Sequence, residues 1–163
     1  MYHRYRQSEE DLRQAETLFR QAILLDPILS APYSGLASVL FLLVMGQYTD
    51  DGGKLTEEAI AAGRKAVELD RNDVNAHATL GRALQLVALN DGNWDEVIAT
   101  VTNALELNPM SPMVHYQMGR AYAFAGQAEE AISHLETMLR FSPRDQRRGP
   151  GDGRHGDSVS YKW

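Results

Sequence analysis

The sequence contains no cysteine, which excludes disulfide bonds and all chemistry that needs a thiolate. It also lacks a basic excess, because 16 lysines and arginines stand against 22 aspartates and glutamates and give a net charge of −6. General binding to nucleic acid, which needs a basic face, is therefore not expected. The longest unbroken apolar run, residues 39–45, is too short to span a membrane. The N-terminal stretch MYHRYRQSEEDL contains no apolar signal core, so we expect a cytoplasmic protein.

The composition is otherwise ordinary for a globular domain. The chain has 163 residues, of which 44% are hydrophobic and 23% charged, and it is long enough to bury a sizeable core. No serine, lysine or carboxylate pair stands in a recognisable arrangement of nucleophile and base. We therefore expect no enzyme and no cofactor.

Four segments each end a run in which apolar residues recur at helical spacing. They are LLDP, ELDR, ELNP and RFSP. They end at residues 27, 71, 109 and 143, which are 44, 38 and 34 residues apart. Small or apolar residues recur twelve positions before each end, at Ala15, Ala59, Val97 and Ala131. A second set recurs five positions before each end, at Ala22, Ala66, Ala104 and Met138.

A partner pattern repeats between these runs. Three groups align in register: Tyr33, Leu36, Ala37, Leu40; His77, Leu80, Gly81, Leu84; and His115, Met118, Gly119, Tyr122. The combined order resembles the W-x₂-L-G-x₂-Y…A-x₃-F…P pattern of the tetratricopeptide repeat (TPR), whose period is 34 residues. The extra residues of the longer repeats fall in GQYTDDGGKL and LNDGNW, where hairpin loops belong. The resemblance implies a right-handed solenoid of antiparallel helix pairs whose first helices line a concave surface.

We therefore predict an all-α fold, in which residues 1–143 form three full repeats preceded by half a repeat. Gly119 and Ala131 are predicted to be small contacts between two antiparallel helices, and Gly126 to turn the chain between them. SEED at 8–11 predicts a capped helix start. The seven predicted helices cover about 8–25, 30–46, 56–69, 73–89, 94–107, 111–125 and 127–140.

The tail 144–163 has another character, with four glycines and five basic residues. Disorder is the prediction, and the alternatives are a docking tag that inserts Trp163 or a segment foreign to the repeats. GDGRHG at 151–156 fits G-x-G-x-x-G, but no strand precedes it, so we do not interpret it as a phosphate site.

The chain also resembles a narrower group. QAILLDPILSAPYSGLA, KAVELDRNDVNAHATLG and EEAISHLETMLRFSPRD are similar to repeat regions of bacterial adenylate cyclases and winged-helix transcription regulators. The resemblance covers about residues 8–145 and includes no cyclase or DNA-binding segment. It implies a regulatory region rather than a catalytic one.

Histidines are the remaining candidates for metal ligands. His77 and His115 occupy equivalent core-facing positions but have no second ligand at the spacing that zinc needs. We expect each ring to fill a large-residue site of its repeat, half-buried, and no metal to be bound. His134 is predicted to lie on the surface.

The predicted binding site is the concave groove. Arg82 and Arg120 occupy equivalent positions, and exposed arginine and aromatic side chains together are typical of interaction surfaces. The alternative is that they are ordinary solvated arginines. We predict a ligand that pairs a carboxylate with an apolar side chain, similar to the carboxylate clamp of chaperone-binding TPR domains. The lysine and asparagine that complete that clamp are not matched here. The predicted groove residues are Asn75, Arg82, Gln85, Met113, Tyr116, Arg120 and Phe124.

The ends of the solenoid are predicted to be open, with Ile132, Leu135 and Leu139 uncovered. We expect a homodimer through the terminal helices, or cover by the terminal segments. The predicted function is a scaffold that binds a peptide or a partner helix, and the alternative is a regulatory segment of a larger cyclase or transcription regulator.

Overall fold

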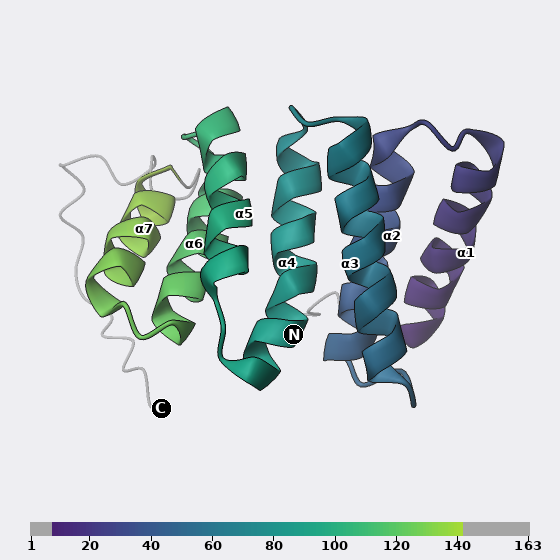
Figure 1. The fold of residues 1–163 in the computed structure, drawn as a ribbon, viewed down its shortest axis with the longest axis horizontal. Helices are drawn as coiled ribbons and strands as arrows, with labels where there is room; N and C mark the ends of the chain where they lie inside the picture. The colour runs from purple at the N-terminus through teal and green to yellow at the C-terminus, as the bar shows by residue number, and fades with distance from the viewer. Residues whose placement is uncertain (1–7, 142–163) are drawn as a thin grey trace, which may run out of the picture.

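A computed structural model describes residues 8–141 of the chain. Within this range the chain forms seven α-helices, which lie side by side in one row, and it forms no strand (Figure 1). The helices are α1 (Glu9–Leu25), α2 (Ser30–Met45), α3 (Gly52–Leu69), α4 (Val74–Asp91), α5 (Asp95–Leu107), α6 (Pro112–Phe124) and α7 (Ala128–Phe141). The predicted all-α architecture is confirmed. Pro143, the N-terminal residues 1–7 and the tail 144–163 lie outside the described residues, so the predictions made for them stay predictions.

The main departure from the predicted boundaries is the start of α3. The helix begins at Gly52, four residues earlier than predicted, so part of the expected hairpin loop is helical. The cause is local: the carboxylate of Asp51 accepts a hydrogen bond from the backbone N–H of Lys54 at 3.0 Å and caps the helix. By contrast, α4 ends two residues later than predicted, at Asp91, because the following Gly92 has a φ of 76°.

The start of α1 agrees with the predicted capping signal. The Ser8 hydroxyl accepts a hydrogen bond from the backbone N–H of Asp11, and the Asp11 carboxylate accepts one from the backbone N–H of Ser8, both at 3.1 Å. The Ser8 hydroxyl and then the Ser8 backbone hold the pKa of the Asp11 carboxyl below its usual range. This reciprocal pair satisfies two backbone donors at the helix start.

The helices pack as alternating first and second members of pairs. The first helices α2, α4 and α6 contact one another in turn, and each second helix packs on the first helices that adjoin it in the chain. Two core clusters result, one around α1 to α3 and the other around α4 to α6. Ala83 belongs to the first cluster and Leu84 to the second, so α4 joins the two.

Small residues set how closely the paired helices approach. A Cβ atom at Gly119 would lie 2.7 Å from Cγ of Leu135 and 3.2 Å from the carbonyl oxygen of Ala131. A Cβ atom at Gly81 would lie 2.6 Å from a methyl carbon of Val101 on the paired helix α5. Gly126 turns the chain with a φ of 79°. The predicted small contacts and the predicted turn are therefore confirmed.

None of the helices between residues 8 and 141 has the length and apolar character needed to cross a bilayer.

Candidate functional site

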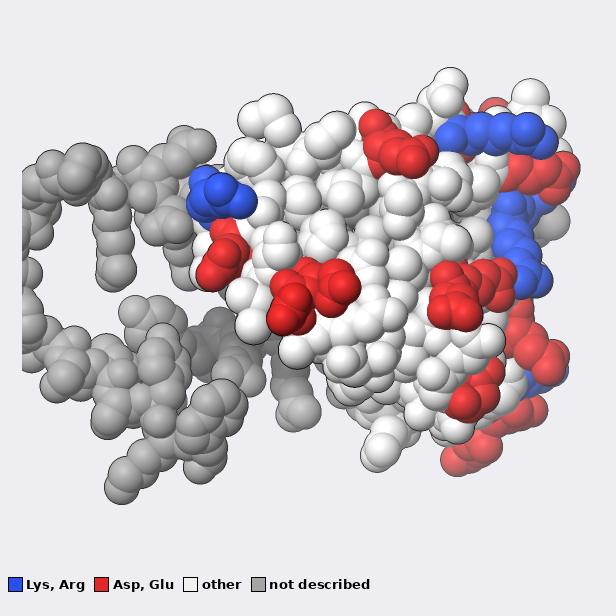
Figure 2. All heavy atoms as spheres, turned by 60° about the vertical axis from the view of Figure 1, so that its left-hand side comes forward, with Lys and Arg blue, Asp and Glu red and all other residues white. Residues whose placement is uncertain are grey.

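Charged side chains are distributed unevenly between the two kinds of helix. The first helices carry only three of them: Arg82 and Asp91 on α4, Arg120 on α6 and none on α2. Asp91 lies at the end of α4 and lines a cleft on the second-helix side. Figure 2 brings the C-terminal end of the row forward and shows acidic side chains there, separated by uncharged surface. The outward side chains of α2, α4 and α6 are here called the first-helix face. Its charged side chains are Arg82 and Arg120, so this face is cationic although the protein has a net charge of −6.

Arg82 lies half-buried on this face. Its guanidinium carbon is 4.5 Å from the centre of the Phe41 ring, which joins α4 to α2 by a cation–π contact. Burial lowers the pKa of Arg82, and the positive charge of Arg120 lowers it further. Because an arginine pKa is so high, Arg82 nevertheless remains charged at neutral pH. The two guanidinium groups therefore repel each other across the face.

Arg120 lies between two aromatic rings of its own helix. Its guanidinium carbon is 5.8 Å from the centre of the Tyr116 ring and 5.9 Å from that of Phe124. The Phe124 ring in turn stacks on Trp94, with 5.0 Å between centres and 8° between planes. Trp94 is buried at the start of α5, so the aromatic platform beside Arg120 is fixed to the core.

Neither Arg82 nor Arg120 forms a salt bridge with any carboxylate of residues 8–141. Arginines 13, 20 and 64 on the second helices do pair with carboxylates. The two first-helix guanidinium groups thus keep donors available for an anion from outside this part of the chain.

The other predicted groove residues lie at different depths. Asn75 is exposed, as are Met113 and Tyr116, which line a shallow hollow of about 200 Å³ at the start of α6. Gln85 is only 2% exposed, and its Nε2 has no hydrogen-bond partner within residues 8–141, so its amide lies in the interior rather than on the face. Helical spacing alone could not reveal this, because the burial of Gln85 depends on the neighbouring helices.

Sequence reasoning missed two aromatic contacts of the face. Phe41 has the helical spacing of a face residue, but nothing local indicates that Arg82 covers its ring. The sequence places Trp94 at the start of a predicted helix and indicates no role for it, yet it occupies the same repeat position as the buried Leu12. The presence of a large apolar residue at this repeat position in both helices is the sequence feature that could have indicated its anchoring role.

The histidines of the last pair form a contact that the sequence did not indicate. His77 and His115 are buried and fill the large-residue sites more completely than predicted. His134, predicted to be on the surface, is half-buried: its Nδ1 is 3.0 Å from Nδ1 of His115, and its ring stacks on Tyr122. The prediction for His134 is wrong because α7 packs this side of its helix against α6. Residues 8–141 contain no group of three or more histidine or carboxylate side chains that could hold a metal ion.

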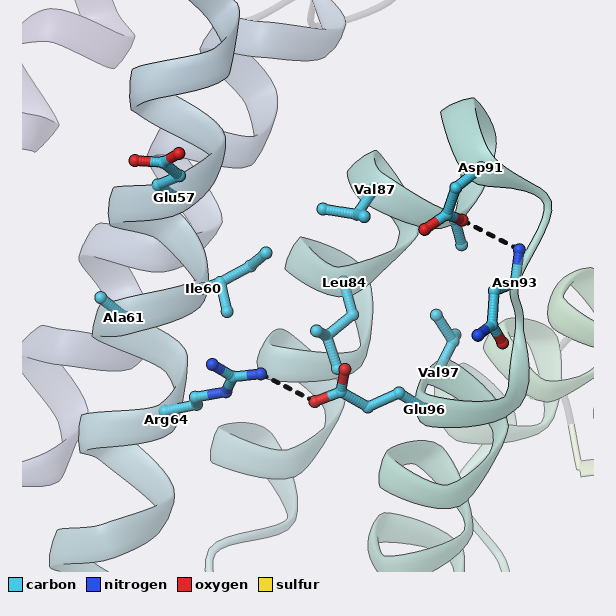
Figure 3. A pocket seen from close by; sticks show the side chains of 11 residues that line it. Glu57, Ile60, Ala61, Arg64, Leu84, Val87, Asp91, Asn93, Glu96 and Val97 are labelled. Atoms are coloured by element: carbon cyan, nitrogen blue, oxygen red, sulfur yellow. Dashed lines mark hydrogen bonds and ion pairs between the residues drawn. The ribbon is translucent and has the colours of Figure 1, made fainter.

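A separate cleft of about 370 Å³ opens on the second-helix side, between α3, α4 and α5. Figure 3 shows Arg64 and Glu96 reaching toward each other across it, at 2.9 Å, while Asp91 accepts a hydrogen bond from the backbone of Asn93. Glu57 also lines the cleft, so carboxylates outnumber its single arginine. Arg64 and Glu96, which are both exposed, already pair with each other. Unlike the first-helix face, the cleft therefore offers an anionic ligand no arginine without a carboxylate partner.

Comparisons with known proteins agree with this architecture. Residues 114–145 match the family model described as tetratricopeptide repeat. The crystal structure of a thermophilic TPR protein from Thermus thermophilus superposes with a TM-score of 0.72 at 19% identity, over 83% of this chain and 68% of that one. The crystal structure of MamA gives a TM-score of 0.61 at 21% identity, over 84% of this chain and 72% of that one.

Relatives at higher identity belong to a longer protein. The transcriptional regulator HilA of Salmonella typhimurium is 31% identical in an alignment of 137 residues that covers 81% of this chain. The HilA of Salmonella typhi matches to the same extent. The chain spans only 23% of the length of these relatives.

Proposed function

We propose that this chain, which belongs to the tetratricopeptide repeat family, is a non-catalytic scaffold that binds a peptide or a partner helix on its first-helix face. In solenoids of this kind the first helices line the concave surface. One observation carries the proposal: Arg82 and Arg120 are the only cations of the first helices, lie beside aromatic rings and pair with no carboxylate of residues 8–141.

The ligand chemistry follows from these two guanidinium groups. Each presents a planar fork of donors that can bind a carboxylate through two parallel hydrogen bonds. An anion near both groups would also relieve their mutual repulsion, which adds to the effect of burial in lowering the pKa of Arg82. Met113 and Tyr116 add exposed apolar surface at the same face. We therefore expect a short segment that combines an acidic side chain or a C-terminal carboxylate with an apolar side chain.

The test uses synthetic peptides that end in an acidic and an apolar residue, each made with a free and with an amidated C-terminus. Fluorescence anisotropy should detect binding to the wild type. Arg120→Ala should weaken it about tenfold or more, since a hydrogen bond to a charged group contributes roughly 1.5–3 kcal/mol. Arg82→Met, which keeps the apolar stem over Phe41, should have a similar effect.

Arg64→Ala is the matched control, because Arg64 is an exposed arginine on the second-helix side. It should bind the peptides like the wild type, and none of the three variants should lose the helical fold in circular dichroism. If Arg120→Ala and Arg82→Met both bind like the wild type, the first-helix face is not the binding site.

A second candidate function is a regulatory segment of a larger transcription regulator. The 31% identity to HilA, a transcriptional regulator, favours it over the cyclase alternative, which stays a prediction. The gene tests this candidate: an in-frame DNA-binding domain encoded upstream of Met1 would support it. Both candidates use the same peptide-binding face and differ in what that face regulates.

We also propose that the chain self-associates through a terminal helix, because both terminal helices of residues 8–141 carry exposed apolar side chains. Ile132 and Leu139 are exposed on α7, whereas Leu135 is half-buried against Gly119. Leu135 is therefore unsuitable for testing self-association, because a charge there would break the α6–α7 contact. The cytoplasmic location stays a prediction.

A further inference from the structure

The outer side of α1 lacks the cover that the equivalent side of the other second helices has. Leu18 is 56% exposed and Leu25 is 87% exposed. The residue equivalent to Leu18 is 7% exposed in α3, where it is Ala62, and 9% exposed in α5, where it is Thr100. In those pairs the first helix covers the position, as Thr100 of α5 beside Gly81 of α4 illustrates. Within residues 8–141, α1 is a second helix without its first helix.

The charged side chains in the middle of α1 are engaged away from this side. Arg13 donates to the carbonyl oxygen of Tyr48 at 2.6 Å, and Arg20 forms an ion pair with Glu58 of α3. Glu16 pairs with both arginines. The uncovered side instead carries a stripe at helical spacing, here called the α1 stripe, whose residues are Ala15, Leu18, Ala22 and Leu25. Its central part is therefore uncharged. Leu18 and Leu25 are exposed, whereas Ala15 and Ala22 are partly buried, Ala15 against the core cluster of α1 to α3.

The two ends of the row differ in charge. On α7 the exposed Ile132 has Glu129 three residues before it and Glu136 four residues after it, on the same side of the helix. Two copies meeting at α7 would bring like charges together. The centre of the α1 stripe is flanked instead by Gln14 and Gln21. The nearest carboxylate on this side, Asp11, lies one turn before Ala15 and is bonded to Ser8, so the central Leu18 and Ala22 of two copies can meet without that repulsion.

The α1 stripe is also complementary to itself. If two α1 helices run antiparallel about a two-fold axis at the level of Arg20, Leu18 of each copy faces Ala22 of the other. Leu25 then faces Ala15. This places a large residue against a small one at every step, which is the packing that Val101 and Gly81 adopt within one chain. A two-fold interface must be self-complementary in this way.

We propose that a second copy of this chain occupies the α1 stripe and forms an antiparallel, two-fold symmetric α1–α1 dimer. The inference rests on the proposed self-association and specifies its end, symmetry and register. It is independent of peptide binding on the first-helix face.

Sedimentation equilibrium of the full chain over a range of concentrations tests the interface. The wild type should be a dimer, and Leu18→Glu should raise its dissociation constant at least about tenfold, because two charges would enter the apolar contact. Leu24→Glu is the matched control: Leu24 is 83% exposed on the same helix but lies outside the α1 stripe. It should dimerise like the wild type, and circular dichroism should show both variants folded, since both side chains are exposed.

The register has its own test. Ala22→Leu alone should weaken the dimer, because Leu18 would meet a second large side chain. The double variant Leu18→Ala/Ala22→Leu restores large against small and should recover the wild-type dissociation constant to within about threefold. A double variant weaker than Ala22→Leu alone would overturn the proposed register.

Other outcomes separate this inference from the broader proposal. A dimer that persists in Leu18→Glu but dissociates in Ile132→Glu would refute the α1 interface and leave self-association intact. Concentration-dependent growth beyond the dimer would refute the two-fold symmetry. A wild type that is monomeric throughout would refute both.

Discussion

Acid should weaken the last helix pair through the contact between His115 and His134. The carbonyl oxygen of Pro109 can only accept a hydrogen bond, so Nε2 of His115, 2.9 Å away, must carry the proton. In the neutral ring Nδ1 of His115 is then an acceptor, and Nδ1–H of His134 donates to it over 3.0 Å. Protonation of His134 would instead place a positive charge on a ring that is half-buried against α6.

The pKa of His134 sets the direction of the effect. Burial lowers this pKa from its ordinary value near 6.5, and the neighbouring His115 lowers it further. Below about pH 6.5 the unfolded chain therefore binds more protons than the folded one. The stabilising contribution of the neutral ring is complete above that pH and is lost as the pH falls through the lower, folded-state pKa.

The size of the effect is bounded by one proton. Its slope cannot exceed about 1.4 kcal/mol per pH unit, and solvent contact of the half-buried His134 ring keeps it lower. Urea unfolding at about pH 7.5 and about pH 5.5 measures the slope. His134→Gln, which keeps a donor for His115 but does not titrate, should reduce the loss of stability on acidification.

His77→Gln is the control, because Nε2 of His77 makes the same kind of contact with the carbonyl oxygen of Arg71 but no second histidine adjoins it. In His77→Gln the contribution of His134 to the pH dependence of the free energy of unfolding should be the same as in the wild type. If wild type and His134→Gln lose the same stability between the two pH values, the reasoning about the histidine pair is wrong.

Two predictions on stability complement those on peptide binding and dimerisation. Leu40→Ala should lower the free energy of unfolding by about 2–5 kcal/mol in a urea titration, because Leu40 is fully buried in the core cluster of α1 to α3. In the same titration the control Leu24→Ala, at an exposed site, should change it by less than about 0.5 kcal/mol. Gly126→Ala should cost roughly 1–2 kcal/mol at φ 79°, since a Cβ there meets no neighbouring atom and only the left-handed backbone is strained; an unchanged melting temperature would contradict this account.

Much of the fold could be predicted because its signals are local. The apolar period, the capping serine at Ser8 and the glycine at Gly126 each act within a few residues of the element that they begin or end. Six of the seven helix starts lie within one residue of their predicted positions, and the exception, at Gly52, depends on a capping Asp51 that was assigned to a loop. The repeat then determined which helices pair, because small residues at fixed spacing mark each crossing.

The candidate site was only partly predictable. The sequence identified Arg82 and Arg120 as equivalent positions on one side of successive helices, since the repeat fixes their spacing. It could not show that Arg82 covers Phe41 or that Arg120 lies on a platform anchored by Trp94. Those contacts join different helices, and their distances depend on how far each pair rotates against the next.

What the sequence by itself determined is thus the number of helices, their pairing and the cationic character of the first-helix face. The tertiary structure alone decided the depth of individual side chains: Gln85 lies in the interior although its helical position predicts exposure, and His134 turns inward to meet His115. The physical reason is that helical periodicity fixes the direction of a side chain about its own axis. Its burial depends on what neighbouring helices place in that direction.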